Sequence, residues 1–105
     1  MMGLLTARQY FDGANTTETK LRTDINALCD GVEWDWFRKD GSNMLYWNWS
    51  PDFGFAVNVP VRGWNECLIT YVLAASSTTH SVPKIVYDNG FAKNGAIIEE
   101  DDSML

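Results

Sequence analysis

The residues best suited to chemistry in this sequence are tryptophans interleaved with acidic side chains. All 5 tryptophans fall between residues 34 and 64, and Glu66 follows shortly after the last of them. Indole faces stack on the apolar C–H faces of sugar rings, while carboxylates bind hydroxyls or protonate a glycosidic oxygen. The region therefore suits a sugar-binding cleft, and the alternative is a tryptophan-rich core that only packs.

Glu66 is the strongest candidate for a catalytic group. We expect it in the first turn of the most apolar helix of the chain, beside Trp64 and just before Leu68. Burial among aromatic rings disfavours a charged carboxylate, so an enclosed Glu66 would keep the proton that a general acid must deliver. The helix dipole favours the carboxylate by about 1 kcal/mol or less, which is smaller than the effect of full burial. The alternative is an ordinary acidic residue at a helix start.

Several other side chains are weaker candidates. Arg62 could bind a sugar hydroxyl or pair with Glu66. Glu33 and Asp35 are two positions apart, so on a helix they would not share a face, although both could lie at the mouth of a cleft. His80 has no partner at metal-ligand spacing and is expected to be a loop histidine. The cysteines lack a CxxC spacing and are expected to be buried free thiols.

Composition and charge restrict the class of protein. A chain of 105 residues with 46% hydrophobic and 21% charged residues suits one small globular domain or part of a larger one. The net charge of −6 argues against nucleic acid or an anionic membrane as the partner, and no apolar run reaches the length of about 18 residues that spans a bilayer. Phosphate-binding, dinucleotide-binding, zinc-peptidase and GxSxG motifs are absent. We expect no cofactor.

Hydrophobic spacing predicts a mainly α-helical chain with one small β-hairpin. Residues 1–11 have helical spacing, Gly13 is expected as a left-handed helix stop, and Asn15 is expected to cap a helix over Thr16–Phe37 with Gly31 as its weak point. A turn at 40–43 precedes two expected strands, 44–49 and 55–60. An apolar helix is expected over 67–77, and Pro83 is suited to begin another.

Both ends of the chain and its apolar helix predict a piece of a larger domain, truncated at both ends. The first helix has no capping residue, and residues 97–105 are typical of an acidic tail outside the core. A helix without a polar face needs more surrounding chain than 105 residues supply.

Four long, tryptophan-rich segments carry a resemblance to a known family. They are GLLTARQYFDG, GVEWDWFRKDG, LYWNWSPDFGFAVNVPVRGWNECLITYVLAASSTTH and VPKIVYDNGFAKNG. In this order they resemble the glucoamylase-like domain of bacterial proteins, a group that includes glycoside hydrolase family 144, the endo-β-1,2-glucanases. The resemblance covers nearly all of residues 1–96. It implies a partial (α/α)6 toroid, which is two concentric rings of helices around a central cleft.

The resemblance also implies an inverting hydrolase of β-glucan that needs no metal, with the β-1,2 linkage as the first choice. The glutamate of the family's R-G-[WY]-N-E-C segment looks like the general acid, and the matching residue in this sequence is Glu66. The family's other essential acids lie just upstream of the GLLTARQYFDG helix, so the general base is unassigned and the isolated 105 residues are expected to be inactive. Candidate sugar contacts, chosen by position, are Trp47, Trp49, Arg62, Trp64 and Asn65.

Two other functions remain open from the sequence. The same toroid could bind carbohydrate without cleaving it, or the chain could be an inactive truncated gene product. An oligo- or polysaccharide is the expected partner of either functional protein, and the oligomeric state is open. Because members of the family are usually exported, the expected location is periplasmic or secreted.

Overall fold

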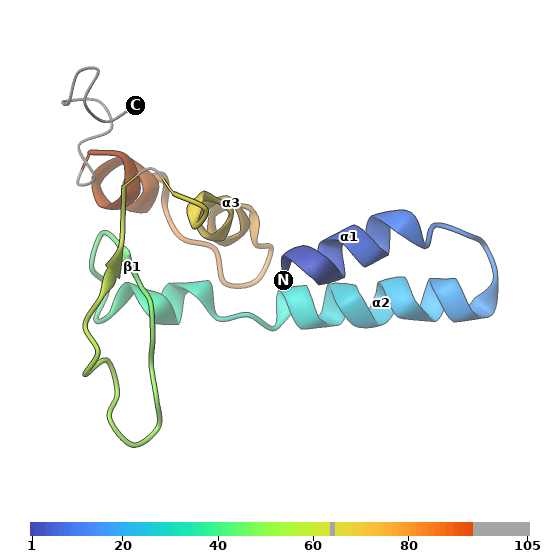
Figure 1. Ribbon diagram of the computed structural model, residues 1–105, viewed down its shortest axis with the longest axis horizontal. Helices are drawn as coiled ribbons and strands as arrows, with labels where there is room; N and C mark the ends of the chain where they lie inside the picture. Colours follow the sequence, from blue (N-terminus) through green and yellow to red (C-terminus); the bar gives the residue numbers. More distant parts are fainter. Residues whose placement is uncertain (64, 94–105) are drawn as a thin grey trace. The chain divides into compact units, whose positions relative to one another are not determined.

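The computed structural model describes residues 1–63 and 65–93, and the elements within them are mostly helical (Figure 1). The chain divides into two compact units, Met1–Val32 and the residues from Glu33 onward. The elements in chain order are α1 (Met2–Tyr10), α2 (Thr16–Asp30), the 3-10 helix η1 (Trp34–Arg38), β1 (Leu45–Tyr46), β2 (Pro60–Val61), α3 (Leu68–Ser76) and the π-helix η2 (Val86–Lys93). The prediction of a mainly helical chain with one small hairpin is confirmed, while Trp64 and the expected acidic tail lie outside the described residues.

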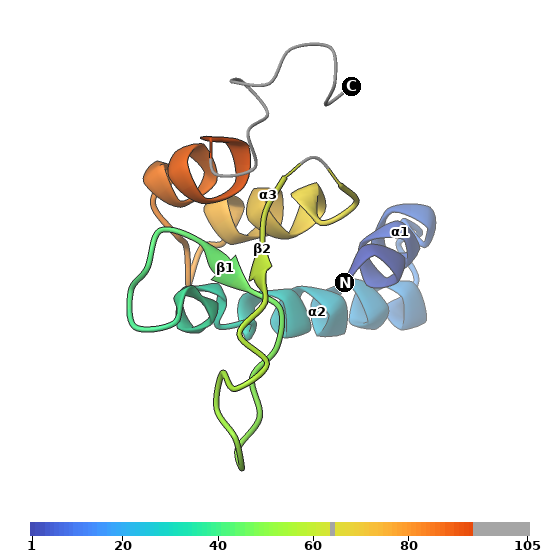
Figure 2. The same ribbon diagram turned by 60° about the vertical axis from the view of Figure 1, so that its left-hand side comes forward.

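In the first unit, α1 and α2 pack side by side as a helical hairpin (Figures 1 and 2). The guanidinium of Arg8 donates a hydrogen bond of 2.7 Å to Oδ1 of Asn26. Arg22 donates to the backbone carbonyls of Phe11 and Gly13, at 2.6 and 2.9 Å. Arg22 thus supplies donors to carbonyls that follow the end of α1, where the backbone has no partner within a helix.

The start of α2 follows the prediction, whereas Gly13 does not. Oδ1 of Asn15 accepts a 2.9 Å hydrogen bond from the backbone N–H of Glu18, and the Glu18 carboxylate bonds to the Asn15 amide. The expectation that Gly13 adopts a left-handed conformation is wrong, because its φ is not positive. A Cβ at this position would meet only the ends of the Glu18 and Asn15 side chains, which are free to move aside, so this contact does not require glycine.

α2 ends at Asp30 and not, as expected, at Phe37. Gly31 is the C-cap, and its N–H donates to the carbonyl of Ala27 at 3.0 Å. The foreseen weak point is therefore the end of the helix, in keeping with the high backbone entropy that glycine loses in a helix. The residues after it form η1, a separate 3-10 helix.

The hairpin of the second unit has shorter strands than the sequence predicted. β1 and β2 pair antiparallel with Leu45 opposite Val61 and Tyr46 opposite Pro60. One further backbone hydrogen bond, 2.8 Å from the N–H of Trp47 to the carbonyl of Val59, extends the pairing. Beyond it, turn hydrogen bonds within residues 53–58 replace cross-strand bonds, so the expected strand over 55–60 is mostly loop.

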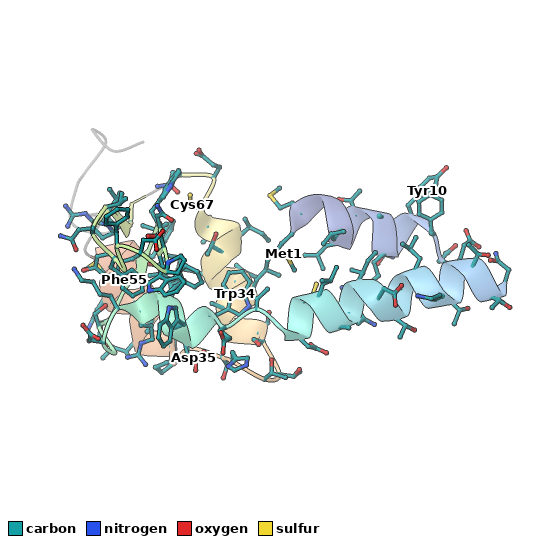
Figure 3. All side chains as sticks on the ribbon, turned by 90° about the horizontal axis from the view of Figure 1, so that it is seen from below. Met1, Tyr10, Trp34, Asp35, Phe55 and Cys67 are labelled. Carbon is teal, nitrogen blue, oxygen red and sulfur yellow. The ribbon has the colours of Figure 1, made fainter. Side chains whose placement is uncertain are left out.

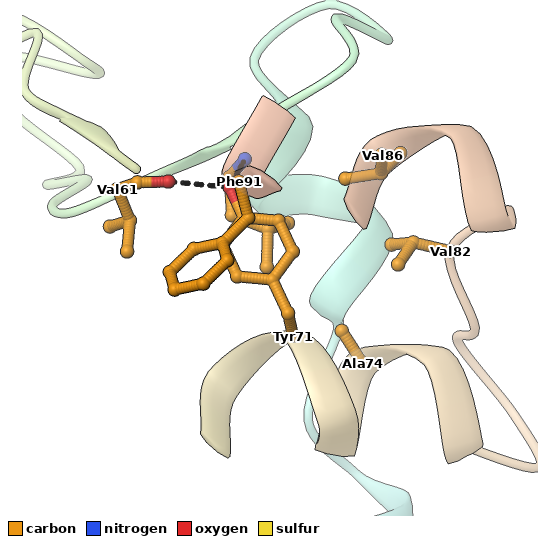
Figure 4. Close-up of a cluster of buried hydrophobic side chains, with 7 residues drawn as sticks. Val61, Tyr71, Ala74, Val82, Val86 and Phe91 are labelled. Atoms are coloured by element: carbon orange, nitrogen blue, oxygen red, sulfur yellow. Dashed lines mark hydrogen bonds between the residues drawn. The ribbon is translucent and has the colours of Figure 1, made fainter. Parts of the chain in front are cut away.

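A cluster of buried apolar side chains joins α3, η2 and the hairpin (Figure 4). Its members are Leu45, Val61, Tyr71, Ala74, Val82, Val86 and Phe91. The hydroxyl of Tyr71 donates to the carbonyl of Val61 at 2.6 Å and accepts from the N–H of Leu45 at 2.9 Å. Burial raises the pKa of this hydroxyl, an effect that its hydrogen bond from Leu45 partly offsets. One side chain of α3 thereby holds both strands of the hairpin.

The last two helices agree with the prediction in position and differ in detail. α3 buries Tyr71 and Ala74 but leaves Val72 exposed, so it is not enclosed on every face by the described residues. The helix expected after Pro83 forms, and most of it is π-helical. Its Gly90 packs so closely on the 43–44 backbone that a Cβ would overlap the carbonyl oxygen of Asn43. Within the described residues, no helix has the length and apolarity that a bilayer span requires.

Candidate active site

The segment that carries Glu66 is a turn braced by hydrogen bonds at both ends. Gly63 has a φ of 82°, a left-handed value that suits glycine, and its N–H donates to the carbonyl of Phe91 at 3.2 Å. Nδ2 of Asn65 donates to the carbonyl of Arg62 at 3.0 Å, and its Oδ1 accepts from the N–H of Cys67 at 2.8 Å. The side-chain amide of Asn65 therefore fixes the residues on either side of Glu66.

Glu66 lies two residues before α3, in this turn and not in the first helical turn as expected. Its side chain is exposed, so the expected enclosure among aromatic rings is not formed by the described residues. A residue in a surface turn lacks the neighbouring helical turns that would cover its side chain, which is the physical reason for the difference. Arg62 is also exposed and makes no ion pair with Glu66 in the described part of the chain.

Two indoles from separate parts of the second unit meet at its surface. The rings of Trp36 in η1 and Trp49 in the hairpin loop are 5.9 Å apart, edge to face at 83°. Their exposed fractions are 54% and 38%, and that of Trp47 is 66%. Trp36 lies in η1, a separate 3-10 helix, and not in a helix that continues from Thr16 to Phe37 as the sequence predicted.

Of the tryptophans that the structure describes, only Trp34 contributes to the core, where it is half-buried against the apolar cluster. The interpretation of this region as a core that merely packs therefore applies to one indole and not to Trp36, Trp47 or Trp49. Large exposed aromatic side chains that gather on a surface mark a binding site more often than single ones do.

Asp35 and His80 form a pair that the sequence did not reveal. Oδ1 of Asp35 lies 3.2 Å from Nδ1 of His80, and both side chains are partly exposed. The sequence predicted a loop histidine with no partner at metal-ligand spacing, and His80 does lie in the loop after α3. The pair joins this loop to η1, next to Trp36, and Figure 3 shows Asp35 at the edge of the second unit. Glu33 is exposed and takes no part in the pair.

The described residues also bear on metal binding and on the cysteines. In residues 1–63 and 65–93, no group of three or more His, Cys, Asp or Glu side chains is arranged to hold a metal ion. Cys29 and Cys67 are free thiols, and each is half-buried, whereas full burial was expected.

Comparison with known proteins gives consistent matches. Residues 58–105 match the Glycoamylase family model, described as "Putative glucoamylase". The chain is 40% identical over 99 residues to an exo β-1,2-glucooligosaccharide sophorohydrolase of Parabacteroides distasonis, a match that covers 93% of this chain and 14% of that protein.

Two solved structures extend the likeness to the fold. The endo-β-1,2-glucanase of Chitinophaga pinensis, in a complex with sophorotriose and glucose, is 52% identical with a TM-score of 0.83, over 90% of this chain and 22% of that one. A β-1,2-glucanase of Parabacteroides distasonis is 43% identical with a TM-score of 0.81, over 86% of this chain and 13% of that one.

These matches confirm the family resemblance that the sequence motifs carry. The chain is similar to glucoamylase-like proteins over about nine-tenths of its length, and its residues 58–105 match the family model. It is similar to proteins named as β-1,2-glucan hydrolases, and it spans less than a quarter of their length.

Proposed function

We propose that this chain belongs to a glycoside hydrolase that cleaves β-glucan, with β-1,2-linked glucan as the substrate, and that Glu66 is its general acid. The observation that carries the proposal is the similarity, over about nine-tenths of the chain, to an endo-β-1,2-glucanase solved with sophorotriose and glucose. The local geometry adds support. Glu66 stands on a braced turn, and its carboxylate forms no ion pair within the described residues.

The proposed mechanism is a single displacement with inversion at the anomeric carbon. Glu66 gives its proton to the glycosidic oxygen as the bond from that oxygen to C1 breaks. A water molecule attacks C1 from the opposite face, and a second carboxylate takes the proton that the water loses. In inverting enzymes the two carboxyl groups stand about 6.5–9.5 Å apart, which leaves room for the water. We assign no residue of the described ranges as that base.

We propose sugar-binding roles for exposed residues of the second unit. The indoles of Trp47 and Trp49 offer open ring faces for stacking on glucose units, and the guanidinium of Arg62 can donate to hydroxyl groups. We also propose Asn65 and Trp64 as sugar contacts. Asn65 is exposed, and its amide has a second N–H besides the one that donates to the carbonyl of Arg62. Asn65 is in addition a positioning residue, because its amide holds the turn of Glu66.

Carbohydrate binding without cleavage is the second candidate function. The exposed indoles favour it, since stacking needs no catalytic acid. Both candidates are compatible with a periplasmic or secreted protein, a location that we also propose and that fractionation of the producing cells would test. What separates the two functions is whether Glu66 is needed for turnover.

The experiment compares hydrolysis of β-1,2-glucan by the complete protein that contains this sequence with hydrolysis by its Glu66→Gln and Glu18→Gln variants. Loss of a general acid lowers kcat by about 10²- to 10⁴-fold, and the neutral amide keeps the shape needed for binding. Glu18→Gln is the matched control, because a glutamine still supports the cap at Asn15. Full turnover by Glu66→Gln would refute the assignment, and inactivity of the unmodified protein with intact glucan binding would favour the second candidate.

A further inference from the structure

The loop between the strands of the hairpin contains a hollow that the proposed catalytic residues do not explain. This hairpin hollow is open, has a volume of about 450 Å³, and is formed entirely by the loop. Its lining residues are Asn48, Ser50, Phe53, Gly54, Ala56 and Val57. The loop extends away from α3, the helix that Glu66 precedes (Figures 1 and 2). The hollow is therefore separate from the proposed acid within this unit.

The backbone gives the hairpin hollow a defined shape. Ser50 and Gly54 exchange two backbone hydrogen bonds, of 3.0 and 2.8 Å, across the loop. The hydroxyl of Ser50 also accepts from the N–H of Phe53 at 3.0 Å. Gly54 has a φ of 56°, which a residue with a side chain adopts only at a cost. These features hold the loop closed on itself before any ligand binds, which lowers the entropy cost of binding.

The side chains around the hollow combine an aromatic face with a free amide. Phe53 is 76% exposed, and Val57 is exposed beside it. The amide of Asn48 is exposed and makes no hydrogen bond within the described residues. An aromatic face for the C–H groups of a sugar and an amide for its hydroxyls are the two kinds of contact that a glucose ring requires. Trp47 and Trp49 flank Asn48 in the same loop.

We propose that the hairpin hollow is an additional subsite that binds a glucose unit of a glucan chain away from the bond being cleaved. This inference rests on the proposed function for the identity of the sugar. The subsite raises the affinity for long chains and takes no part in proton transfer. An apolar segment of protein is the alternative occupant, and the free amide of Asn48 on the rim favours the sugar.

The test measures binding by titration calorimetry for the complete protein and for its Phe53→Ala, Asn48→Ala and Tyr10→Ala variants. The probes are sophorotriose and a long β-1,2-glucan. Tyr10→Ala is the matched control, because Tyr10 is 77% exposed and lies in the other unit. We expect Phe53→Ala and Asn48→Ala to bind the long glucan about tenfold more weakly, which corresponds to the loss of roughly one stacking or hydrogen-bonding contact. Binding of sophorotriose and the thermal midpoint should not change.

The outcomes separate this subsite from the catalytic proposal. Unchanged binding of the long glucan by Phe53→Ala would overturn the subsite, even if the unmodified protein hydrolyses glucan. A fall in the thermal midpoint of Phe53→Ala without weaker glucan binding would also overturn it, because it identifies protein as the occupant. Selective loss of long-chain affinity in a protein that binds but does not cleave glucan would support the subsite and count against Glu66 as an acid.

Discussion

The substitution Tyr71→Phe removes one oxygen atom. It should destabilise the second unit more than a Tyr→Phe substitution at any other tyrosine of that unit. The hydroxyl of Tyr71 donates to the carbonyl of Val61 at 2.6 Å and accepts from the N–H of Leu45 at 2.9 Å, and all three residues are buried. The phenyl ring of the variant fills the same space, so no large cavity opens. Two buried backbone groups, however, lose their partner.

The size of the loss follows from those two groups. A buried donor or acceptor left without a partner costs about 1–3 kcal/mol, so the two together predict a decrease of about 2–6 kcal/mol in the free energy of unfolding. Urea denaturation of the 105-residue chain, followed by circular dichroism, measures this difference. Tyr87→Phe is the matched control, because Tyr87 stacks on Phe91 at 5.9 Å but its hydroxyl has no hydrogen bond within the described residues. Equal stability losses in the two variants would refute the reasoning.

The same hydroxyl predicts how stability depends on alkaline pH. Burial raises the pKa of Tyr71 above the ordinary value of 10.0, so in the unfolded chain this group ionises at lower pH than in the folded one. Its contribution to stability is therefore fully present below pH 10.0 and is lost as the pH rises from there through the raised pKa. Tyr71→Phe should lack this part of the alkaline decline, and an identical pH profile in both proteins would contradict it.

Two further predictions concern close packing and the turn of Glu66. Gly90→Ala should lower the free energy of unfolding by about 1–3 kcal/mol, because its Cβ overlaps the carbonyl of Asn43, whereas Gly3→Ala, where nothing lies within 4 Å, should be neutral or stabilising in the same urea experiment. Asn65→Ala should lower kcat for β-1,2-glucan in the complete protein more than it raises KM, because the turn loses both side-chain hydrogen bonds. Asn65→Asp, which keeps the acceptor for Cys67, should retain more activity, and a change confined to KM would contradict a positioning role.

Local signals in the sequence predicted the parts of the fold that depend on neighbouring residues. The cap at Asn15 needs only Glu18 three residues later, and the break at Gly31 needs only the backbone entropy of glycine. The hairpin position was also predictable from β-prone residues around a turn-rich segment. Its strand length was not, because turn bonds within 53–58 compete with cross-strand pairing.

Contacts between residues far apart in the sequence escaped prediction. The bond from the N–H of Leu45 to the hydroxyl of Tyr71 joins positions 26 residues apart, and nothing in either local pattern indicates it. The pairs Trp36–Trp49 and Asp35–His80 likewise depend on how η1 packs. The hydrophobic periodicity had assigned the residues of η1 to a longer α2. For the candidate site, the sequence singled out Glu66 and the exposed indoles, but it could not show that the amide of Asn65 serves the backbone.

The proposed acid role of Glu66 is tested most directly by changing the leaving group of the substrate. A general acid matters when the leaving oxygen is basic, as in a glucan, and matters little when the oxygen departs readily, as in a 2,4-dinitrophenyl glycoside. For the Glu66→Gln variant of the complete protein, we predict a kcat about 10²- to 10⁴-fold lower on β-1,2-glucan and nearly unchanged on a 2,4-dinitrophenyl β-sophoroside. Equal losses on both substrates, or no loss on glucan, would contradict proton donation by Glu66.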